Sequence, residues 1–216
     1  MKYDYGKEFD PNQLAPTNID RLSVSLVPEK SKLLELGCAT GFMSKYFTQM
    51  KQCRVFGVEI DPEMAKLAAK SCENVLIADL DEPQTWSKIQ VVSPFDVAFA
   101  SAIIEHLKNP WAALQSIKEV LKPHGILIIT TSNIAHWRMR LNLLLGRWQY
   151  QDYGILDNTH LRFFTYNTFQ QAVEQAGFAV EHIGIDSAGG IKYFNWLARH
   201  FPNLYAHQMV IRARKL

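Results

Sequence analysis

The sequence predicts an α/β fold, in which helices cover both faces of a doubly wound, mostly parallel sheet of seven strands. Short apolar runs alternate with helical segments along residues 32–131. The runs are almost continuously apolar, which is typical of parallel strands buried on both faces. The first run ends in a glycine-containing turn that leads directly into helical spacing. Right-handed crossovers follow from this alternation, and ligands of such sheets bind beyond the carboxyl ends of the strands.

Length and composition exclude several classes of protein. The chain has 216 residues, 48% of them apolar and 20% charged, with a formal net charge of +2. We therefore expect one domain with an insertion, and neither disorder nor an obligatory polyanionic partner. Three cysteines without C-x-x-C spacing argue against a disulfide framework or a zinc site. No signal-peptide core or membrane span is evident, so we expect a cytoplasmic protein without a transmembrane segment.

The stretch from Lys32 to Ser44, KLLELGCATGFMS, organises the chain. Its first five residues form an apolar run, the next five a turn of small residues, and the segment FMSKYFTQM then has helical spacing. Such a turn presents backbone N–H groups at a helix N-terminus, where a polar or anionic ligand group can bind. The dinucleotide fingerprint needs glycine at 37, 39 and 42, but the chain has Gly37, Ala39 and Phe42. A pyrophosphate is therefore a poor candidate ligand.

The elements around this stretch follow from the same alternation. Residues 1–30 are first polar and aromatic and then helical in spacing, so we expect a flap over 1–10 and a helix over 18–26, before Pro28. Asp61 followed by Pro62 predicts a helix start, because proline is favoured in the first turn. Further strands are predicted at 54–60, 74–79, 95–101 and 125–131, and helices from Asp61, over 83–89 and over 110–121.

The alternation is interrupted between Asn133 and Thr165 by a segment rich in aromatic and basic residues. We interpret this segment as an insertion that binds the acceptor or forms a lid, closing with residues 1–10 over the ligand. The alternation then resumes with a helix over 166–176, ended by Gly177. Three final elements are predicted: a strand at 178–185, a short helix at 193–201 after a loop at 187–190, and a last strand at 206–213.

Two acids end successive predicted strands. Glu59 ends the second strand, next to the glycine turn, where a carboxylate can accept both hydroxyls of a ribose. Asp79 ends the third strand, where it can meet the exocyclic amine of an adenine that stacks between Ile60 and Leu80. A single acid in such a place is more often a helix N-cap or a solvated charge. The ordered set of glycines and acids favours a nucleoside-containing ligand.

Taken together, LLELGCATG, VFGVEIDPEM, VLIADL, FDVAFASAIIEHL and LKPHGILIITTSN resemble the successive motifs of class I S-adenosylmethionine (SAM) dependent methyltransferases, over roughly residues 32–133. The downstream run D-N-T-H-L-R-F-F-T is similar to that of a bacterial subgroup. The resemblance implies a Rossmann-like sheet with an antiparallel last strand, SAM as cofactor and S-adenosylhomocysteine (SAH) as product. It also implies cofactor contacts from Glu35, Gly37, Gly41, Glu59, Asp79, Ser101 and Ala102, whereas Ala39 stands where many members have glycine.

Methyl transfer from a sulfonium needs alignment and exclusion of water, and it needs a base only when the acceptor is a hydroxyl. The candidate bases are His160, His106 and Asp157. His160 is either the base or a residue that holds the insertion in place. For His106 we favour a structural or supporting role, because Glu105-His106-Leu107 is expected to open a helix that the histidine caps.

The predicted function is O-methylation of a small polar or carbohydrate-like acceptor. We expect Arg162, Tyr153 and Trp137 to contact this acceptor, although Arg162 is also a candidate for an ion pair that holds the lid. Residues 136–148 predict either a helix packed on the domain or on a second subunit of a homodimer, or a basic face for a membrane surface. Nucleic-acid substrates are disfavoured, because no N/D-P-P-Y/F run follows the fourth strand. The alternatives are N-methylation and a non-catalytic partner protein similar to the MetW type.

Overall fold

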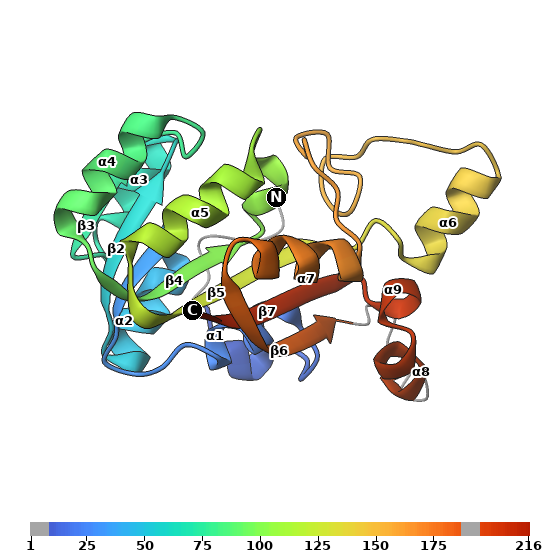
Figure 1. Cartoon of the computed structure of the whole chain (residues 1–216), viewed down its shortest axis with the longest axis horizontal. Helices are drawn as coiled ribbons and strands as arrows, with labels where there is room; N and C mark the ends of the chain where they lie inside the picture. The colour runs from blue at the N-terminus through green and yellow to red at the C-terminus, as the bar shows by residue number, and fades with distance from the viewer. Residues whose placement is uncertain (1–8, 187–194) are drawn as a thin grey trace.

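The computed structural model describes residues 9–186 and 195–216, and in them the predicted sheet is confirmed (Figure 1). Seven strands lie in the order β3-β2-β1-β4-β5-β7-β6. Only β7 runs antiparallel to its neighbours, which are β5 and β6. The strands are β1 (Lys32–Leu36), β2 (Arg54–Glu59), β3 (Asn74–Ile77), β4 (Phe95–Ser101), β5 (Leu121–Ser132), β6 (Phe178–Asp186) and β7 (Gln208–Lys215).

Apart from a short helix at 202–205 that was not predicted, the α-helices occur near the positions that caps and spacing predict. Asn18 accepts hydrogen bonds from two backbone N–H groups at the start of the first helix, and Asp61 does the same for the third. Thr165 and Thr168 form a capping box at the helix that follows the insertion. The α-helices are α1 (Ile19–Ser25), α2 (Phe42–Lys51), α3 (Pro62–Ala68), α4 (Pro83–Val92), α5 (Pro110–Val120), α6 (Trp137–Leu144), α7 (Tyr166–Gln175), α8 (Asn195–His200) and α9 (Pro202–Tyr205), with 3-10 helices η1 (Pro11–Gln13) and η2 (Ile104–His106).

Alternation along the strands divides the core into two layers. Leu34 and Leu36 of β1 face one cluster, which contains the buried side chains of α4, α5 and α7. Leu33 faces the other cluster, which contains those of α1 and α2, including Phe47. The sheet is therefore covered on both faces, as near-continuous apolar strands require.

Some element boundaries differ from the predictions. β5 begins at Leu121, which was expected to end a helix, because Leu121 pairs with Phe95 before a bulge leads into the regular ladder at Ile126. β3 stops at Ile77, two residues before Asp79, and α4 continues to Val92. The predicted loop at 187–190 and residues 1–8 of the predicted flap lie outside the described residues.

The connection between β5 and α7, residues 133–165, leaves the sheet and returns to it at one point. Asn133 pairs with Phe164 in an isolated bridge, and the Asn133 side chain donates to the carbonyl oxygen of Ala206 at 2.8 Å. Beyond this base, α6 stands well away from the sheet (Figure 1). None of its residues is buried, and Leu144 is 82% exposed. α6 therefore adds no side chain to the buried core of the domain, and its packing on a second subunit or on a membrane surface stays a prediction.

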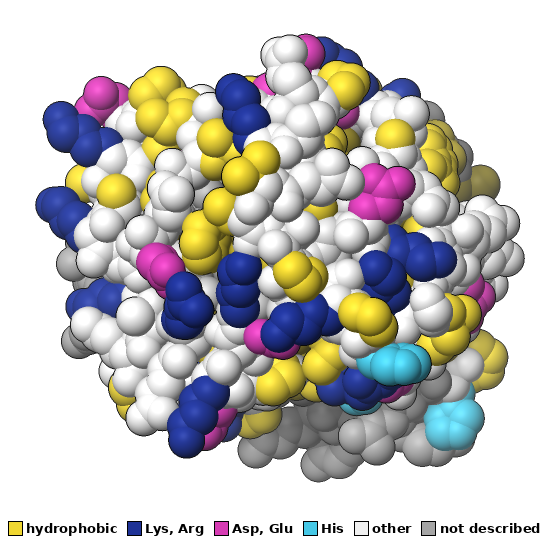
Figure 2. All heavy atoms as spheres, turned by 60° about the vertical axis from the view of Figure 1, so that its left-hand side comes forward, with side chains coloured by type: hydrophobic (Ala, Val, Ile, Leu, Met, Phe, Trp, Pro, Cys, Tyr) yellow, Lys and Arg dark blue, Asp and Glu magenta, His cyan; other side chains and the backbone are white. Residues whose placement is uncertain are grey.

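Neither a metal-binding cluster nor a membrane-spanning helix occurs in the described part of the chain. No three His, Cys, Asp or Glu side chains in residues 9–186 and 195–216 converge as a metal site requires. No helix of the same residues is long and apolar enough to cross a bilayer. Figure 2 shows lysine and arginine side chains spread over one face with acidic side chains between them, rather than gathered into one basic patch.

Candidate cofactor pocket and histidine cluster

A pocket of about 240 Å³ lies at the carboxyl ends of β1, β2 and β4. The strand order reverses between β1 and β4, and ligands of open α/β sheets bind at such a switch point. Side chains of α1 and α2 complete the wall of the pocket. Of the residues predicted to bind the cofactor, those that line it are Glu35, Gly37, Ala39, Glu59, Ser101 and Ala102.

Glu59 connects two strand ends through backbone hydrogen bonds. One carboxylate oxygen accepts from the N–H of Ala39 at 2.8 Å, in the turn after β1. The other accepts from Ile60 and Asp61, at 2.9 and 3.0 Å. A carboxylate offers about four lone-pair directions, so one remains for a ligand. Glu59 therefore both shapes the turn and presents an acceptor to the pocket.

The turn after β1 depends on left-handed backbone at Gly37, Ala39 and Gly41, whose φ angles are +69°, +48° and +76°. A Cβ on Gly37 would lie 2.5 Å from the Ile103 side chain, and one on Gly41 would lie 2.7 Å from Cα of Ala68 in α3. Both positions therefore require glycine for space as well as for conformation. Ala39 adopts the same conformation with its methyl group, so the departure from the family pattern is accommodated in this turn.

The described residues that line the pocket include three acids, Asp20, Glu35 and Glu59, and no lysine, arginine or histidine. Burial raises the pKa of Glu35 to about 8, although a hydrogen bond from the Ser44 hydroxyl opposes the shift. Asp20 on α1 is only 3% exposed. An acidic lining without basic side chains favours a cationic ligand over a phosphate.

Four predicted cofactor residues lie outside the pocket lining. Gly41 supports the turn against α3. Ile60 is 62% exposed beside the pocket, whereas Leu80 is packed in the core. One carboxylate oxygen of Asp79 accepts from the N–H of Asp81 at 2.8 Å, which stabilises the loop before α4. The contacts predicted for Ile60, Asp79 and Leu80 would require a ligand that extends beyond the pocket.

Beyond Ile103, the chain leads from the pocket into a group of polar side chains that we call the histidine cluster: Glu105, His106, Asp157, Thr159 and His160. The rings of His106 and His160 meet edge to face, with centroids 4.7 Å apart. The N–H groups of residues 161 and 162 both donate to the carbonyl oxygen of Glu105. The structure thereby joins η2 to the far end of the 133–165 segment and brings together all three predicted catalytic residues.

His160 is nearly buried within this cluster. Its Nδ1 lies 3.1 Å from the carbonyl oxygen of Ile155, which can only accept, so Nδ1 carries the proton. The neutral ring therefore has its acceptor at Nε2, which is 4.0 Å from Oε1 of Glu105. Burial raises the pKa of Glu105, although the nearby histidines oppose the shift. Its second carboxyl oxygen, Oε2, is buried without a hydrogen-bond partner among the described residues.

Asp157 orients the other histidine. Its Oδ1 accepts from the hydroxyl of Thr159 at 2.6 Å, and that hydroxyl lies 3.1 Å from Nδ1 of His106. Asp157 therefore acts through Thr159 on His106, rather than directly on the ring of His160. His106 lies in the short helix η2 and caps nothing there, because the next α-helix begins at Pro110 with Asn109 as its cap. The expectation of a capping role for His106 is wrong.

Sequence reasoning missed Glu105, Thr159 and Asp20 as site residues. Glu105 is adjacent to the predicted His106, but its burial beside His160 depends on a contact between segments 55 residues apart. Thr159 precedes His160 in the motif D-N-T-H, and a hydroxyl next to a predicted base could have indicated that it belongs to the site. Asp20 had no such signal, because only tertiary packing brings α1 to the pocket.

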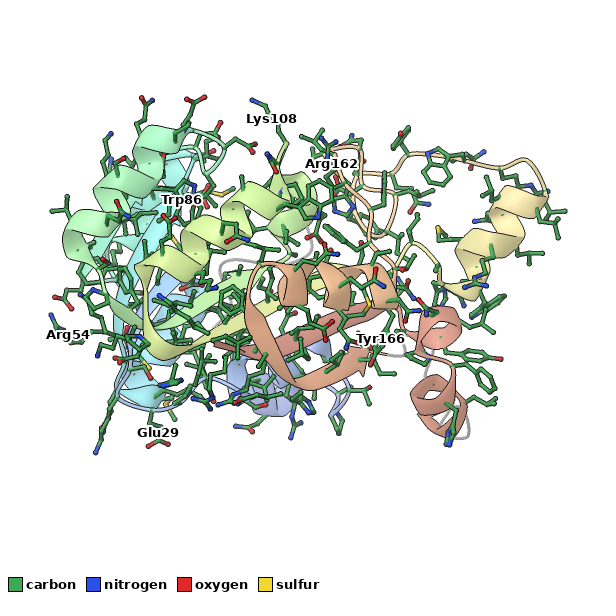
Figure 3. The ribbon with its side chains drawn as sticks, in the orientation of Figure 1. Glu29, Arg54, Trp86, Lys108, Arg162 and Tyr166 are labelled. Atoms are coloured by element: carbon green, nitrogen blue, oxygen red, sulfur yellow. The ribbon has the colours of Figure 1, made fainter. Side chains whose placement is uncertain are left out.

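The residues predicted to bind the acceptor separate into two places. Trp137 and Tyr153 line a cavity of about 580 Å³ between α6 and residues 149–156. Arg162 lies elsewhere, along the upper edge of the view on which Lys108 also lies (Figure 3). Its guanidinium donates to the carbonyl oxygen of Leu161 at 3.0 Å, and no ion pair of Arg162 occurs within the described residues.

Comparison with known proteins identifies relatives of this chain. A family model described as a methyltransferase domain matches residues 7–183. The mitochondrial ubiquinone biosynthesis O-methyltransferase of Rattus norvegicus is 28% identical over 198 residues, which are 85% of this chain and 55% of that protein. The ubiquinone biosynthesis O-methyltransferase of Histophilus somni is 29% identical over 142 residues, 61% of this chain and 58% of that protein. The chain thus spans about half the length of the curated relatives that it matches.

A solved structure supports the fold. The SAM-dependent methyltransferase of Archaeoglobus fulgidus superimposes with a TM-score of 0.65 at 18% identity, covering 90% of each chain. At this level of identity the likeness concerns the arrangement of strands and helices.

Proposed function

This chain belongs to the methyltransferase domain family, and we propose that it transfers the methyl group of SAM to a hydroxyl oxygen of a small polar acceptor. The observation that carries this proposal is the adjacency of two sites. Ser101, Ala102 and Ile103 line the acidic pocket, and Glu105 and His106 of the histidine cluster follow directly in the chain. A cofactor pocket thereby leads into a group of side chains capable of proton transfer.

The pocket residues fit SAM, the cofactor that the family implies. SAM carries a positive sulfonium and supplies an activated methyl group, and the pocket is lined by acids without basic side chains among the residues described. Glu59 would accept a hydrogen bond from one ribose hydroxyl through the single acceptor direction that its three backbone donors leave. Asp20 would lie toward the more positive end of the molecule, Glu35 would present a protonated carboxyl beside it, and Ser101 and Ala102 would form the wall beside the sulfonium. The turn at 37–41 would approach the cofactor through its backbone.

His160 is the proposed general base. Its Nδ1–H is bound to a carbonyl oxygen, so Nε2 would accept the proton of the acceptor hydroxyl while the oxygen takes the methyl group, with the carbon–sulfur bond breaking to leave SAH. The resulting imidazolium is stabilised by Glu105, whose Oε1 lies 4.0 Å from Nε2. His106, held through Thr159 and Asp157, supports the ring of His160 from the edge and is the second candidate base.

The acceptor is proposed to approach from beneath residues 133–165. The side chains of Trp137 and Tyr153 in the 580 Å³ cavity can cover the face of a ring, which suits either an aromatic or a carbohydrate-like molecule. The names of the relatives support O-methylation. Segment 133–165 would close over the bound acceptor and exclude water, which an in-line methyl transfer requires.

Turnover and binding, measured side by side, test this proposal. The purified protein is incubated with SAM and separate panels of phenolic and sugar hydroxyl compounds, and methylated products are identified by mass. With an acceptor found, His160→Ala should lower turnover by about two to four orders of magnitude, the usual contribution of a general base. Its SAH affinity should remain that of the wild type, whereas its melting temperature should fall modestly because the hydrogen bond to the Ile155 carbonyl oxygen is lost.

His106→Ala is the matched variant, because it removes the neighbouring ring and leaves His160 in place. A His160→Ala protein that binds SAH and turns over at the wild-type rate would overturn the assignment of the base. Tight SAH binding without methylation of either panel, together with co-purification of an acyltransferase, would instead indicate a non-catalytic partner protein.

A further inference from the structure

Two cysteine thiols meet beneath the cofactor turn. Cys38 belongs to the turn and lines the pocket, whereas Cys72 follows α3. A Cβ on Gly57 of β2 would lie 2.7 Å from Sγ of Cys38 and 3.3 Å from Sγ of Cys72. These two distances limit the separation of the sulfur atoms to 6.0 Å at most. The missing side chain of Gly57 therefore makes the space in which both thiols are accommodated.

The two thiols are not equivalent. Hydrogen bonding with Cys38 lowers the pKa of Cys72 to about 7, and Cys72 Sγ is also 3.1 Å from the Ser44 hydroxyl. The hydrogen bond with Cys72, followed by burial, raises the pKa of Cys38. Cys38 is 1% exposed, whereas Cys72 is partly exposed. A reachable thiol with thiolate character beside a second thiol is the arrangement that redox-sensitive cysteines share.

We propose that Cys38 and Cys72 form a reversible disulfide when the protein meets a peroxide, and that this bond weakens cofactor binding. The Cys72 thiolate attacks one peroxide oxygen, the O–O bond breaks, and hydroxide leaves, so that Cys72 becomes a sulfenic acid. The Cys38 sulfur then attacks Cys72 sulfur, the S–O bond breaks, and the released hydroxide takes up the Cys38 proton as water. Two thiols are thereby oxidised by two electrons, and the peroxide is reduced. A dithiol reductant reverses the bond by exchange.

The position of Cys38 connects this bond to the pocket. A disulfide holds its sulfur atoms about 2.05 Å apart, so Cys38 must turn toward Cys72. The next residue, Ala39, donates its N–H to Glu59, and Gly41 packs directly on the backbone of α3. Little room is available for the turn to move without losing these contacts. Oxidation is therefore expected to displace the turn from Glu59 and to change the wall of the cofactor pocket.

The experiment uses the Cys53→Ala protein, in which Cys38 and Cys72 are the remaining cysteines. After treatment with hydrogen peroxide and blocking of free thiols, peptides are mapped by mass without reduction. We expect a Cys38–Cys72 cross-link, a loss of SAH affinity of about tenfold or more by calorimetry, and recovery with dithiothreitol. Cys72→Ser in the same background is the matched control, because it keeps a polar group beside Ser44. It should form no intramolecular cross-link, and its SAH affinity should survive peroxide.

Two results would overturn the proposal. One is oxidation that stops at a sulfinic acid on Cys72 with no cross-link to Cys38. The other is a complete cross-link with unchanged SAH affinity. Since the mass map does not depend on methyl transfer, failure of the disulfide is distinguishable from failure of the proposed activity.

Discussion

The cofactor pocket and the 133–165 segment lie next to each other and are built by different means. In the pocket, residues sit at the ends of paired strands, and Glu59 is held by three backbone N–H groups. In the segment, α6 buries none of its residues, and Leu143 and Leu144 are 60% and 82% exposed. One region is fixed by the sheet, whereas the other is attached mainly at its base.

This difference separates cofactor binding from acceptor binding. A pocket fixed by the sheet is pre-organised, so that little free energy is lost in ordering it when a ligand binds. A segment with few buried contacts opens at low free-energy cost and can adapt to an acceptor. The histidine cluster lies where the two regions meet, because Glu105 follows β4 and His160 belongs to the segment. Substitutions in the pocket should therefore change stability and cofactor affinity more than comparable substitutions in the 133–165 segment.

The largest difference in unfolding free energy is expected between alanine substitutions of Phe47 and Leu144. Phe47 is fully buried under the pocket, with its ring 5.0 Å from that of Phe99. Phe47→Ala should lower the free energy of unfolding by about 3–5 kcal/mol, whereas Leu144→Ala should change it by less than about 0.5 kcal/mol. Urea unfolding of both variants measures the difference. A large loss for Leu144→Ala would show that α6 packs against something in solution.

A smaller contrast is expected between two glycines with left-handed backbone. Gly41→Ala combines an unfavourable φ with overlap on the backbone of α3, and should cost on the order of 3 kcal/mol together with SAH affinity. Gly146 in the segment has a φ of +67°, and a methyl group there would meet nothing within 4 Å, so Gly146→Ala should cost about 1–2 kcal/mol from strain alone. Equal losses in unfolding free energy would show that space around Gly41 is not limiting.

Cofactor affinity should distinguish Glu59 from a nearby acid outside the pocket. Glu59→Ala removes an acceptor for the ribose and the support of Ala39, and should weaken SAH binding by about 1–3 kcal/mol. Glu63, exposed in the first turn of α3, is the matched control, and Glu63→Ala should bind as the wild type does. Calorimetry showing the same affinity for both variants would remove Glu59 from the site. Asp79→Ala, measured alongside, tests whether the ligand extends beyond the pocket.

The two regions should also respond to pH with opposite signs. The pKa of Glu35 is raised to about 8, so the native state keeps a proton that the unfolded chain releases above 4.5, and stability falls as pH rises through this window. Burial lowers the pKa of His136 to about 4, so the unfolded chain takes up a proton that the native state does not. The stability contributed by the neutral His136 is therefore lost as pH falls from 6.5 toward 4.

Each group should contribute at most about 1.4 kcal/mol per pH unit within its window. Glu35→Gln, which can still accept from Ser44, should flatten the unfolding free energy between pH 5 and about 8. His136→Asn, which keeps a cap for α6, should flatten it between about 4 and 6.5. Unchanged pH profiles in both variants would contradict the two assignments.

By itself, the sequence determined the sheet, its crossovers and the cofactor turn, because these depend on local patterns. Apolar runs, helix caps and the glycines at 37 and 41 act within a few residues of each other, and parallel strands bring their ends together at one edge. Gly37, Glu59 and Ser101 are therefore neighbours in the pocket wherever the strands pair in this order.

Only the tertiary structure decided which side chains meet across the irregular 133–165 segment. No periodicity relates residues 133–165 to η2, so the burial of Glu105 beside His160 and the relay from Asp157 to His106 could not be derived from spacing. The same holds for Asp20, which reaches the pocket because α1 packs on the sheet, and for Cys38 and Cys72, whose thiols meet over Gly57. Contacts of this kind depend on how elements pack, and packing is a property of the whole chain.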